Sequence, residues 1–287
     1  MEFRAARSVD EALTCLAEVG DEAQVVAGGT DVMIQHMRRE IDPSVLLHIG
    51  RLNELDGIAT NGALSFGTLT THRNLATNPL VAAALPALAE AASTVGGWQT
   101  QEVGTLGGNL CNASPAADTV PPLLVADAHV ELRSAAGTRR LSLDEFLLGR
   151  RKTARLAHEL LTTITAIPLG DRSGETYLKL GRRSAMEVAV VGLAVRLTFD
   201  ETGTVASARV AACSVAPRPY RATEAERVLA GSRLEAEVLA EAGRALVDSA
   251  VPIDDARASS AYRLRVLPGL LARAVGVCRD RVGADGS

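Results

Sequence analysis

Thr105-Leu106-Gly107-Gly108-Asn109, continuing to Ser114-Pro115-Ala116-Ala117-Asp118, is the stretch that decides the fold. A related peptide, Ala27-Gly28-Gly29-Thr30-Asp31, stands earlier in the chain. Each peptide places paired glycines and a hydroxyl or amide side chain at a predicted chain reversal, beside a predicted helix start. Such a loop offers bare backbone N–H groups to an anion, with no Cβ in the way. The pair therefore predicts an extended dinucleotide whose pyrophosphate is held from both sides.

The two loops do not match the common nucleotide-binding motifs. Neither is followed by Gly-Lys-Ser/Thr, which disfavours nucleotide hydrolysis. Neither has the GxGxxG spacing of a Rossmann loop, which disfavours a nicotinamide cofactor bound in that way.

Composition narrows the class of protein. The chain has 287 residues, 47% of them hydrophobic, and a net charge of −4, so we expect two globular domains and no binding of nucleic acid. No apolar run is long enough to span a membrane and no signal peptide is visible, so a cytoplasmic location is expected. The four cysteines and five histidines show no metal-ligand spacing, and no catalytic residue or metal site is predicted.

The coarse pattern predicts an α+β fold. A helix over Ser8–Val19, a hairpin about Asn61-Gly62 and a helix over Leu80–Val95 are expected in the first part. After a linker at 170–174, alternating stretches predict a small antiparallel sheet, and three C-terminal helices follow.

Two single residues can be interpreted in two ways. Asp118 is either a helix cap or a carboxylate that accepts hydrogen bonds from a ligand. Lys179 is either a solvated strand lysine or a cation that approaches a cofactor.

The motifs resemble the FAD-binding medium subunit of molybdenum hydroxylases, the carbon monoxide dehydrogenase and xanthine dehydrogenase family. The first domain of that family is matched by 26–31 and 104–118, and its C-terminal domain by 177–183 and 258–263. The resemblance implies a two-lobed PCMH-type (vanillyl-alcohol-oxidase-like) FAD-binding domain over 1–170. A carbon monoxide dehydrogenase flavoprotein-like C-terminal domain would cover 174–282.

The resemblance also implies roles for single residues. Those expected to wrap the FAD phosphates are Ala27, Gly28, Gly29, Thr30, Asp31, Thr105, Gly107, Gly108 and Asn109. Cys111 and Asn112 would lie beside the isoalloxazine, Asp118 would hydrogen-bond the cofactor, and Lys179 would stabilise the reduced flavin.

The family implies an electron-transfer subunit with an iron–sulfur partner and a molybdopterin partner, whose FAD delivers electrons to NAD, oxygen or a quinone. One departure stands out, because Thr100-Gln101 replaces an Ile-Arg pair found in many relatives. The altered segment from Trp98 to Gln101 motivates an alternative, a free-standing FAD-dependent oxidoreductase acting directly on a small molecule. A second alternative is a non-catalytic flavin-binding assembly module.

Overall fold

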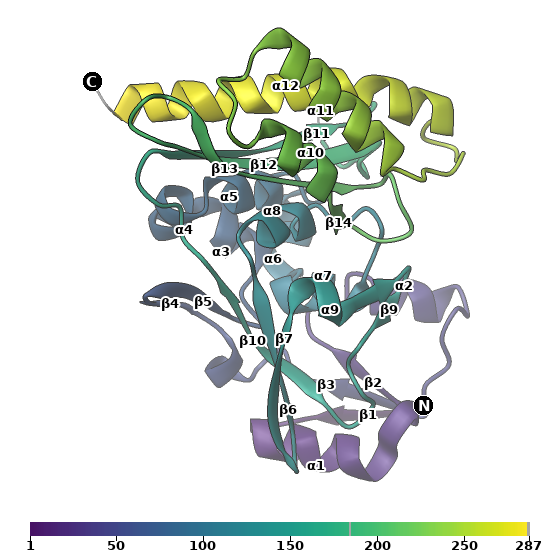
Figure 1. Cartoon of the computed structure of the whole chain (residues 1–287). Coiled ribbons are helices and arrows are strands. Elements are labelled where there is room, and N and C mark those ends of the chain that lie inside the picture. Colours follow the sequence, from purple (N-terminus) through teal and green to yellow (C-terminus); the bar gives the residue numbers. More distant parts are fainter. Residues whose placement is uncertain (184, 286–287) are drawn as a thin grey trace. The chain divides into compact units, whose positions relative to one another are not determined.

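A computed structural model describes residues 1–183 and 185–285 (Figure 1). The chain forms two compact units. The first contains Met1–Asn74, Trp98–Ala113 and Ala128–Ile167; the second contains Leu75–Gly97, Ser114–Asp127 and the C-terminal part from Pro168. Two segments of the first expected domain thus pack with the C-terminal part of the chain. The division into 1–170 and 174–282 remains a prediction about the modules of the sequence.

The first unit begins with a small parallel sheet. Its strand order is β1 (Glu2–Ala5), β3 (Val45–His48), β2 (Ala23–Val26), and helix α1 (Val9–Val19) packs on it. Ser8 is the N-cap of α1, and its hydroxyl accepts the Glu11 N–H at 3.1 Å. The Glu11 carboxylate accepts the N–H of Arg7, one residue before the position that a capping box requires.

A five-stranded antiparallel sheet is the largest sheet of this unit, which also contains the two-stranded sheet of β8 (Leu147–Gly149) and β9 (Lys152–Thr153). Its order is β4 (Ile58–Asn61), β5 (Ala63–Gly67), β10 (Leu160–Ala166), β6 (His129–Ser134), β7 (Gly137–Ser142). Gly62 has a φ of +73° and joins β4 to β5, which confirms the predicted Asn-Gly hairpin.

The remaining elements of the first unit are short, and some of them flank the two glycine loops. They are α2 (Val32–Met37), α6 (Trp98–Val103), α7 (Leu106–Asn112), α9 (Leu143–Phe146), β8 (Leu147–Gly149) and β9 (Lys152–Thr153), with 3₁₀ turns η1 (Gly20–Glu22) and η2 (Asn53–Leu55). Helix α3 (His72–Thr77) links the first unit to the second.

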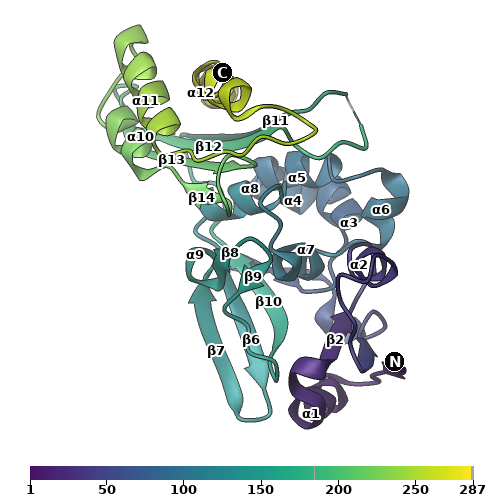
Figure 2. The same ribbon diagram turned by 90° about the vertical axis from the view of Figure 1, so that its right-hand side faces the viewer.

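The second unit is built on a four-stranded antiparallel sheet. The order is β11 (Ser173–Leu180), β12 (Val191–Phe199), β13 (Val205–Cys213), β14 (Tyr220–Arg221). Figures 1 and 2 show helices on both faces. One face carries α10 (Thr223–Leu229), α11 (Ala236–Asp248) and α12 (Ser260–Asp285); the other carries α4 (Pro79–Ala84), α5 (Pro86–Ser93) and α8 (Val120–Val125). Because helices cover both faces of the sheet, β12 is buried almost throughout.

The fold class, α+β with a small antiparallel sheet and C-terminal helices, is confirmed. Two details of the expected pattern are wrong. The helix expected over 80–95 is two helices, because Leu85 precedes Pro86 and adopts a φ of −143°. Strand β11 already begins at Ser173, inside the expected linker. In the part of the chain that the structure describes, no helix is long and apolar enough to cross a membrane.

Candidate functional site

The first glycine loop, 27–31, connects β2 to α2, and its five residues are half-buried. The N–H groups of Gly28, Gly29, Thr30 and Asp31 make no hydrogen bond to any described residue. Gly29 adopts a φ of +71°, the left-handed region that favours glycine. Four successive free donors are the feature that an anion requires. The loop therefore fits the diphosphate of a dinucleotide.

Gly28 has a second role, in packing. A Cβ built on this residue would lie 1.7 Å from the carbonyl oxygen of Val103 and 3.2 Å from the nitrogen of Gly104. The missing side chain thus lets the first loop lie directly against the chain that leads into the second loop.

In the second glycine loop, the backbone N–H groups of 106–109 are hydrogen-bonded to other residues of the chain. Thr105 is the N-cap of α7, and its hydroxyl accepts the Gly108 N–H at 3.1 Å. The N–H of Gly107 donates to the Thr68 carbonyl at 2.9 Å, and that of Asn109 to the Thr105 carbonyl at 3.0 Å. The expectation that this loop offers bare N–H groups is wrong. A Cβ on Gly107 would lie 1.7 Å from the Thr68 hydroxyl, so this glycine serves close packing.

Asn112 ties the two loops together. Its side-chain oxygen accepts a hydrogen bond from Gln35 of α2 at 3.0 Å, and its side-chain amide N–H donates to the Asp31 carboxylate. Burial raises the pKa of Asp31, and Arg151 and Asn112 partly offset that rise. The neighbouring Cys111 is a half-buried free thiol whose pKa is raised by burial. The proposed place of Cys111 and Asn112 beside the isoalloxazine stays a prediction.

Asp118 and Lys179, predicted separately, form an ion pair within the second unit. Their atoms Oδ2 and Nζ are 2.8 Å apart, and the side chains are 9% and 10% exposed. The Lys179 ammonium also donates to the carbonyl of Thr94 at 2.9 Å, the residue that ends α5. A cation at a helix C-terminus is favoured by the helix dipole. Lys179 is therefore not the solvated strand lysine of the first interpretation.

Sequence reasoning missed Tyr177 as a partner of this pair. Its hydroxyl donates to Asp118 Oδ1 at 2.6 Å. Burial raises the pKa of Asp118, and its contacts with Lys179 and Tyr177 oppose that rise. One signal could have drawn attention to this place: Lys152 and Lys179 are the only lysines among 30 basic residues.

Arg263, in the C-terminal motif at 258–263, has a structural role. Arg263 is 1% exposed, and its guanidinium donates to the carbonyls of Val190 and Ser214 and to the Asp255 carboxylate, at 2.6, 3.0 and 2.7 Å. It joins the start of α12 to the sheet of the second unit.

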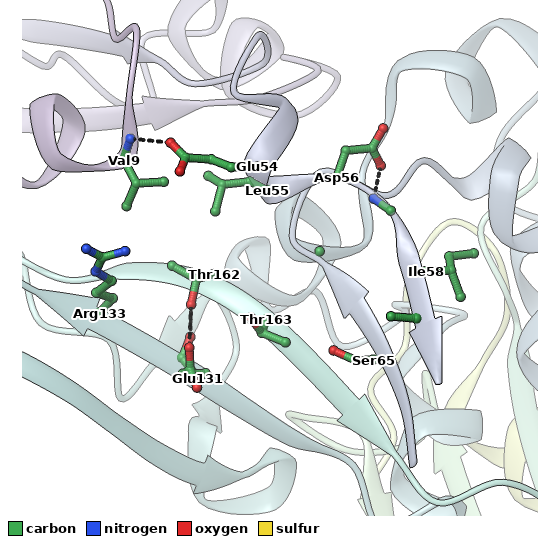
Figure 3. Close-up of a pocket in the computed structure, with 13 residues that line it drawn as sticks. Val9, Glu54, Leu55, Asp56, Ile58, Ser65, Glu131, Arg133, Thr162 and Thr163 are labelled. Atoms are coloured by element: carbon green, nitrogen blue, oxygen red, sulfur yellow. Dashed lines mark hydrogen bonds between the residues drawn. The ribbon is translucent and has the colours of Figure 1, made fainter. Parts of the chain in front are cut away.

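A cavity of about 450 Å³ lies elsewhere in the first unit (Figure 3). It is lined by η2, β4, β5, β6 and β10, with Glu54, Asp56, Glu131 and Arg133 among its polar side chains. None of the predicted site residues lines it.

Two protein-family models match this chain. The family described as the FAD-binding domain in molybdopterin dehydrogenase matches residues 1–169, and the carbon monoxide dehydrogenase flavoprotein C-terminal domain matches residues 176–277. The 6-hydroxypseudooxynicotine dehydrogenase complex subunit alpha of Paenarthrobacter nicotinovorans is 32% identical over 95% of this chain and 92% of its own length. The carbon monoxide dehydrogenase medium chain of Hydrogenophaga pseudoflava is 30% identical over 96% and 95%.

Solved structures of related enzymes contain chains with a similar fold. A chain of the Hydrogenophaga pseudoflava carbon monoxide dehydrogenase has a TM-score of 0.94 at 30% identity, and covers 98% of both chains. A chain of quinoline 2-oxidoreductase from Pseudomonas putida 86 has a TM-score of 0.90 at 27% identity, with the same coverage. The protein therefore belongs to the family of FAD-binding medium subunits of molybdenum-containing dehydrogenases, oxidoreductases in which this subunit carries FAD.

Proposed function

We propose that this chain is the electron-transfer subunit of a molybdenum hydroxylase complex, with an iron–sulfur subunit and a molybdopterin subunit as partners. Bound FAD would supply the redox chemistry, taking electrons from [2Fe–2S] clusters and giving them to an acceptor such as NAD, oxygen or a quinone. The names of the relatives, a complex subunit alpha and a medium chain, support a function within a complex.

The observation that carries the proposal is the set of free donors in the first loop. The N–H groups of 28–31 would hold the FAD diphosphate, with the Thr30 hydroxyl beside them. In the second loop, the side chains of Thr105 and Asn109 and the exposed surface of Gly108 would add contacts to the cofactor.

Lys179 would act on the flavin ring. An ammonium group has three donors, and contacts with Thr94 and Asp118 account for two of them among the described residues. The third donor would approach the flavin, where positive charge stabilises the reduced, anionic form. At an effective dielectric constant near 20, a unit charge at about 4 Å contributes on the order of 4 kcal/mol before desolvation is subtracted. The pairing with Asp118 reduces this contribution.

Anaerobic reduction of the flavin tests the proposal. The FAD-loaded chain is mixed either with its dithionite-reduced iron–sulfur subunit, freed of excess dithionite, or with candidate aldehydes, purines and N-heterocycles. We expect the flavin absorption to bleach with the iron–sulfur subunit and to persist with the small molecules alone. Bleaching by a small molecule alone would instead favour the free-standing oxidoreductase. A flavin that neither donor reduces would favour the assembly module.

A further inference from the structure

The Tyr177 hydroxyl is buried at the ion pair of Asp118 and Lys179. The residue is 4% exposed, and burial, together with the neighbouring Cys213 and Asp118, raises its pKa well above the ordinary value of 10. The phenol therefore stays protonated at neutral pH and donates to Asp118 Oδ1 at 2.6 Å. The opposite carboxylate oxygen, Oδ2, holds the Lys179 ammonium.

The missing side chain of Gly192 leaves space in the sheet for this hydroxyl. On β12, Gly192 pairs in register with Lys179 on one side and Cys213 on the other. A Cβ on Gly192 would lie 2.3 Å from the Tyr177 hydroxyl oxygen and 2.5 Å from the Cys213 sulfur. Only glycine leaves enough space for the phenol to reach Asp118.

The backbone of β11 is fixed at the same place. Glu90 of α5 accepts the Tyr177 N–H at 2.8 Å and the Thr176 hydroxyl at 2.9 Å. Two residues further along the strand, Lys179 donates to Thr94 at the end of the same helix. Tyr177 and Lys179 project from the same side of the strand, as alternate residues do. One strand therefore presents a neutral donor and a cation to the same carboxylate.

We propose that Tyr177 is a positioning residue: by fixing one oxygen of Asp118, it makes the other oxygen a rigid anchor for the Lys179 ammonium. The proposal rests on the proposed function only where it concerns the flavin. Without the phenol hydroxyl, the carboxylate could turn about its last side-chain bond. The ammonium would then lose one of its two fixed contacts and would lie, on average, farther from the flavin.

A flavin-independent experiment tests the anchor itself. Since Lys152 and Lys179 are the only lysines, the FAD-free chain has two side-chain ammonium signals in a ¹⁵N NMR spectrum, and Lys179→Met identifies them. Exchange of the buried Lys179 protons with water should be faster in Tyr177→Phe. Exchange of the exposed Lys152 protons should not change. Tyr220→Phe is the matched control, because it removes a hydroxyl that contacts Ser249 at 3.0 Å in the same unit. Unchanged Lys179 exchange in Tyr177→Phe would overturn the proposal.

A double-mutant cycle on the FAD-loaded chain tests the consequence. Lys179→Met should lower the flavin midpoint potential, and Tyr177→Phe should lower it by a smaller amount. An about threefold loss in the preference for reduced flavin corresponds to about 14 mV for a two-electron couple. Tyr177→Phe should add nothing in the Lys179→Met background, because the hydroxyl acts through the ammonium.

The possible outcomes distinguish the anchoring role of Tyr177 from the proposed role of Lys179 at the flavin. No shift in Lys179→Met would contradict the proposed role of Lys179 at the flavin, while the exchange experiment would still decide the anchor. A shift in Lys179→Met with an equal effect of Tyr177→Phe in both backgrounds would show that Tyr177 acts by packing alone. Tyr177→Phe keeps the aromatic ring, and thermal unfolding checks that the variant is folded.

Discussion

Gly28 decides whether the two glycine loops can lie side by side. Its missing side chain leaves space for the Val103 carbonyl, which a Cβ would approach to 1.7 Å. We predict that Gly28→Ala forces one loop away from the other. Overpacking of this kind costs about 1–3 kcal/mol, and the FAD content should fall because the donors at 28–31 move. Urea unfolding of the FAD-free chain and the flavin-to-protein ratio of the purified chain measure the two effects.

Gly149→Ala is the matched control for this prediction. It lies in the same unit, a Cβ there meets nothing within 4 Å, and its φ is not in the left-handed region. We expect normal stability and FAD content. If Gly28→Ala also bound FAD at the wild-type ratio, the first loop would not be the diphosphate site.

At the residue scale, the sequence identified candidate site residues better than it identified the residues with which they pair. Asp118 and Lys179 could each be identified from a motif, yet their pairing joins residues 61 positions apart. Tyr177 has no local signal of its role, because the space for its hydroxyl is made by Gly192 on another strand. Contacts of this kind depend on strand register, which single-residue patterns do not encode.

At the scale of elements, Asp255 and Arg263 attach the start of α12 to the sheet. Asp255 is 20% exposed in its side chain and pairs with Arg257 and Arg263 at 2.6 and 2.7 Å. Burial raises the pKa of Asp255, but hydrogen bonds from Arg257 and the Ala258 N–H outweigh burial and lower it from 3.8 to about 2. The carboxylate therefore stabilises the fold above pH 3.8, and that contribution is lost as the pH falls through 2.

Asp255→Asn should remove this pH-dependent contribution. The lowering of the Asp255 pKa from 3.8 to about 2 corresponds to about 2.5 kcal/mol of stability at neutral pH. We predict a lower free energy of unfolding at pH 7 and a smaller decrease between pH 4 and pH 2 than in the wild-type chain. Urea unfolding across this range measures both. The control is Asp248→Asn, at the exposed end of α11. Parallel pH curves for Asp255→Asn and wild type would refute the assignment.

The elements also show where sequence patterns fail. The break between α4 and α5 had a local signal in Pro86, which an alanine-rich helical pattern obscured. In the second glycine loop, the N–H groups of Gly108 and Asn109 donate to Thr105, the N-cap of α7. Those of Leu106 and Gly107 donate to Thr70 and Thr68, partners in a distant segment that the local sequence does not reveal.

For the whole molecule, we expect FAD to bind non-covalently. The first loop offers N–H donors, which hold a diphosphate without a covalent bond. Cys111 is the nucleophile closest in sequence to the second loop, and burial raises its pKa, which keeps the thiol protonated and poorly reactive. We predict that acid precipitation releases all FAD into the supernatant. Adding FAD back to the FAD-free chain should restore the flavin spectrum.

Reversible binding has a measurable consequence for stability. A ligand that binds only the folded chain stabilises it by about 2.7 kcal/mol at a free concentration 100 times its Kd. The denaturation midpoint of the FAD-free chain should therefore rise steadily with added FAD, whereas a covalent flavin would leave no such dependence. Yellow colour retained in the acid pellet would contradict the prediction, and Cys111→Ser would then test the attachment point. Release of the colour by that one substitution would assign the bond to the Cys111 sulfur.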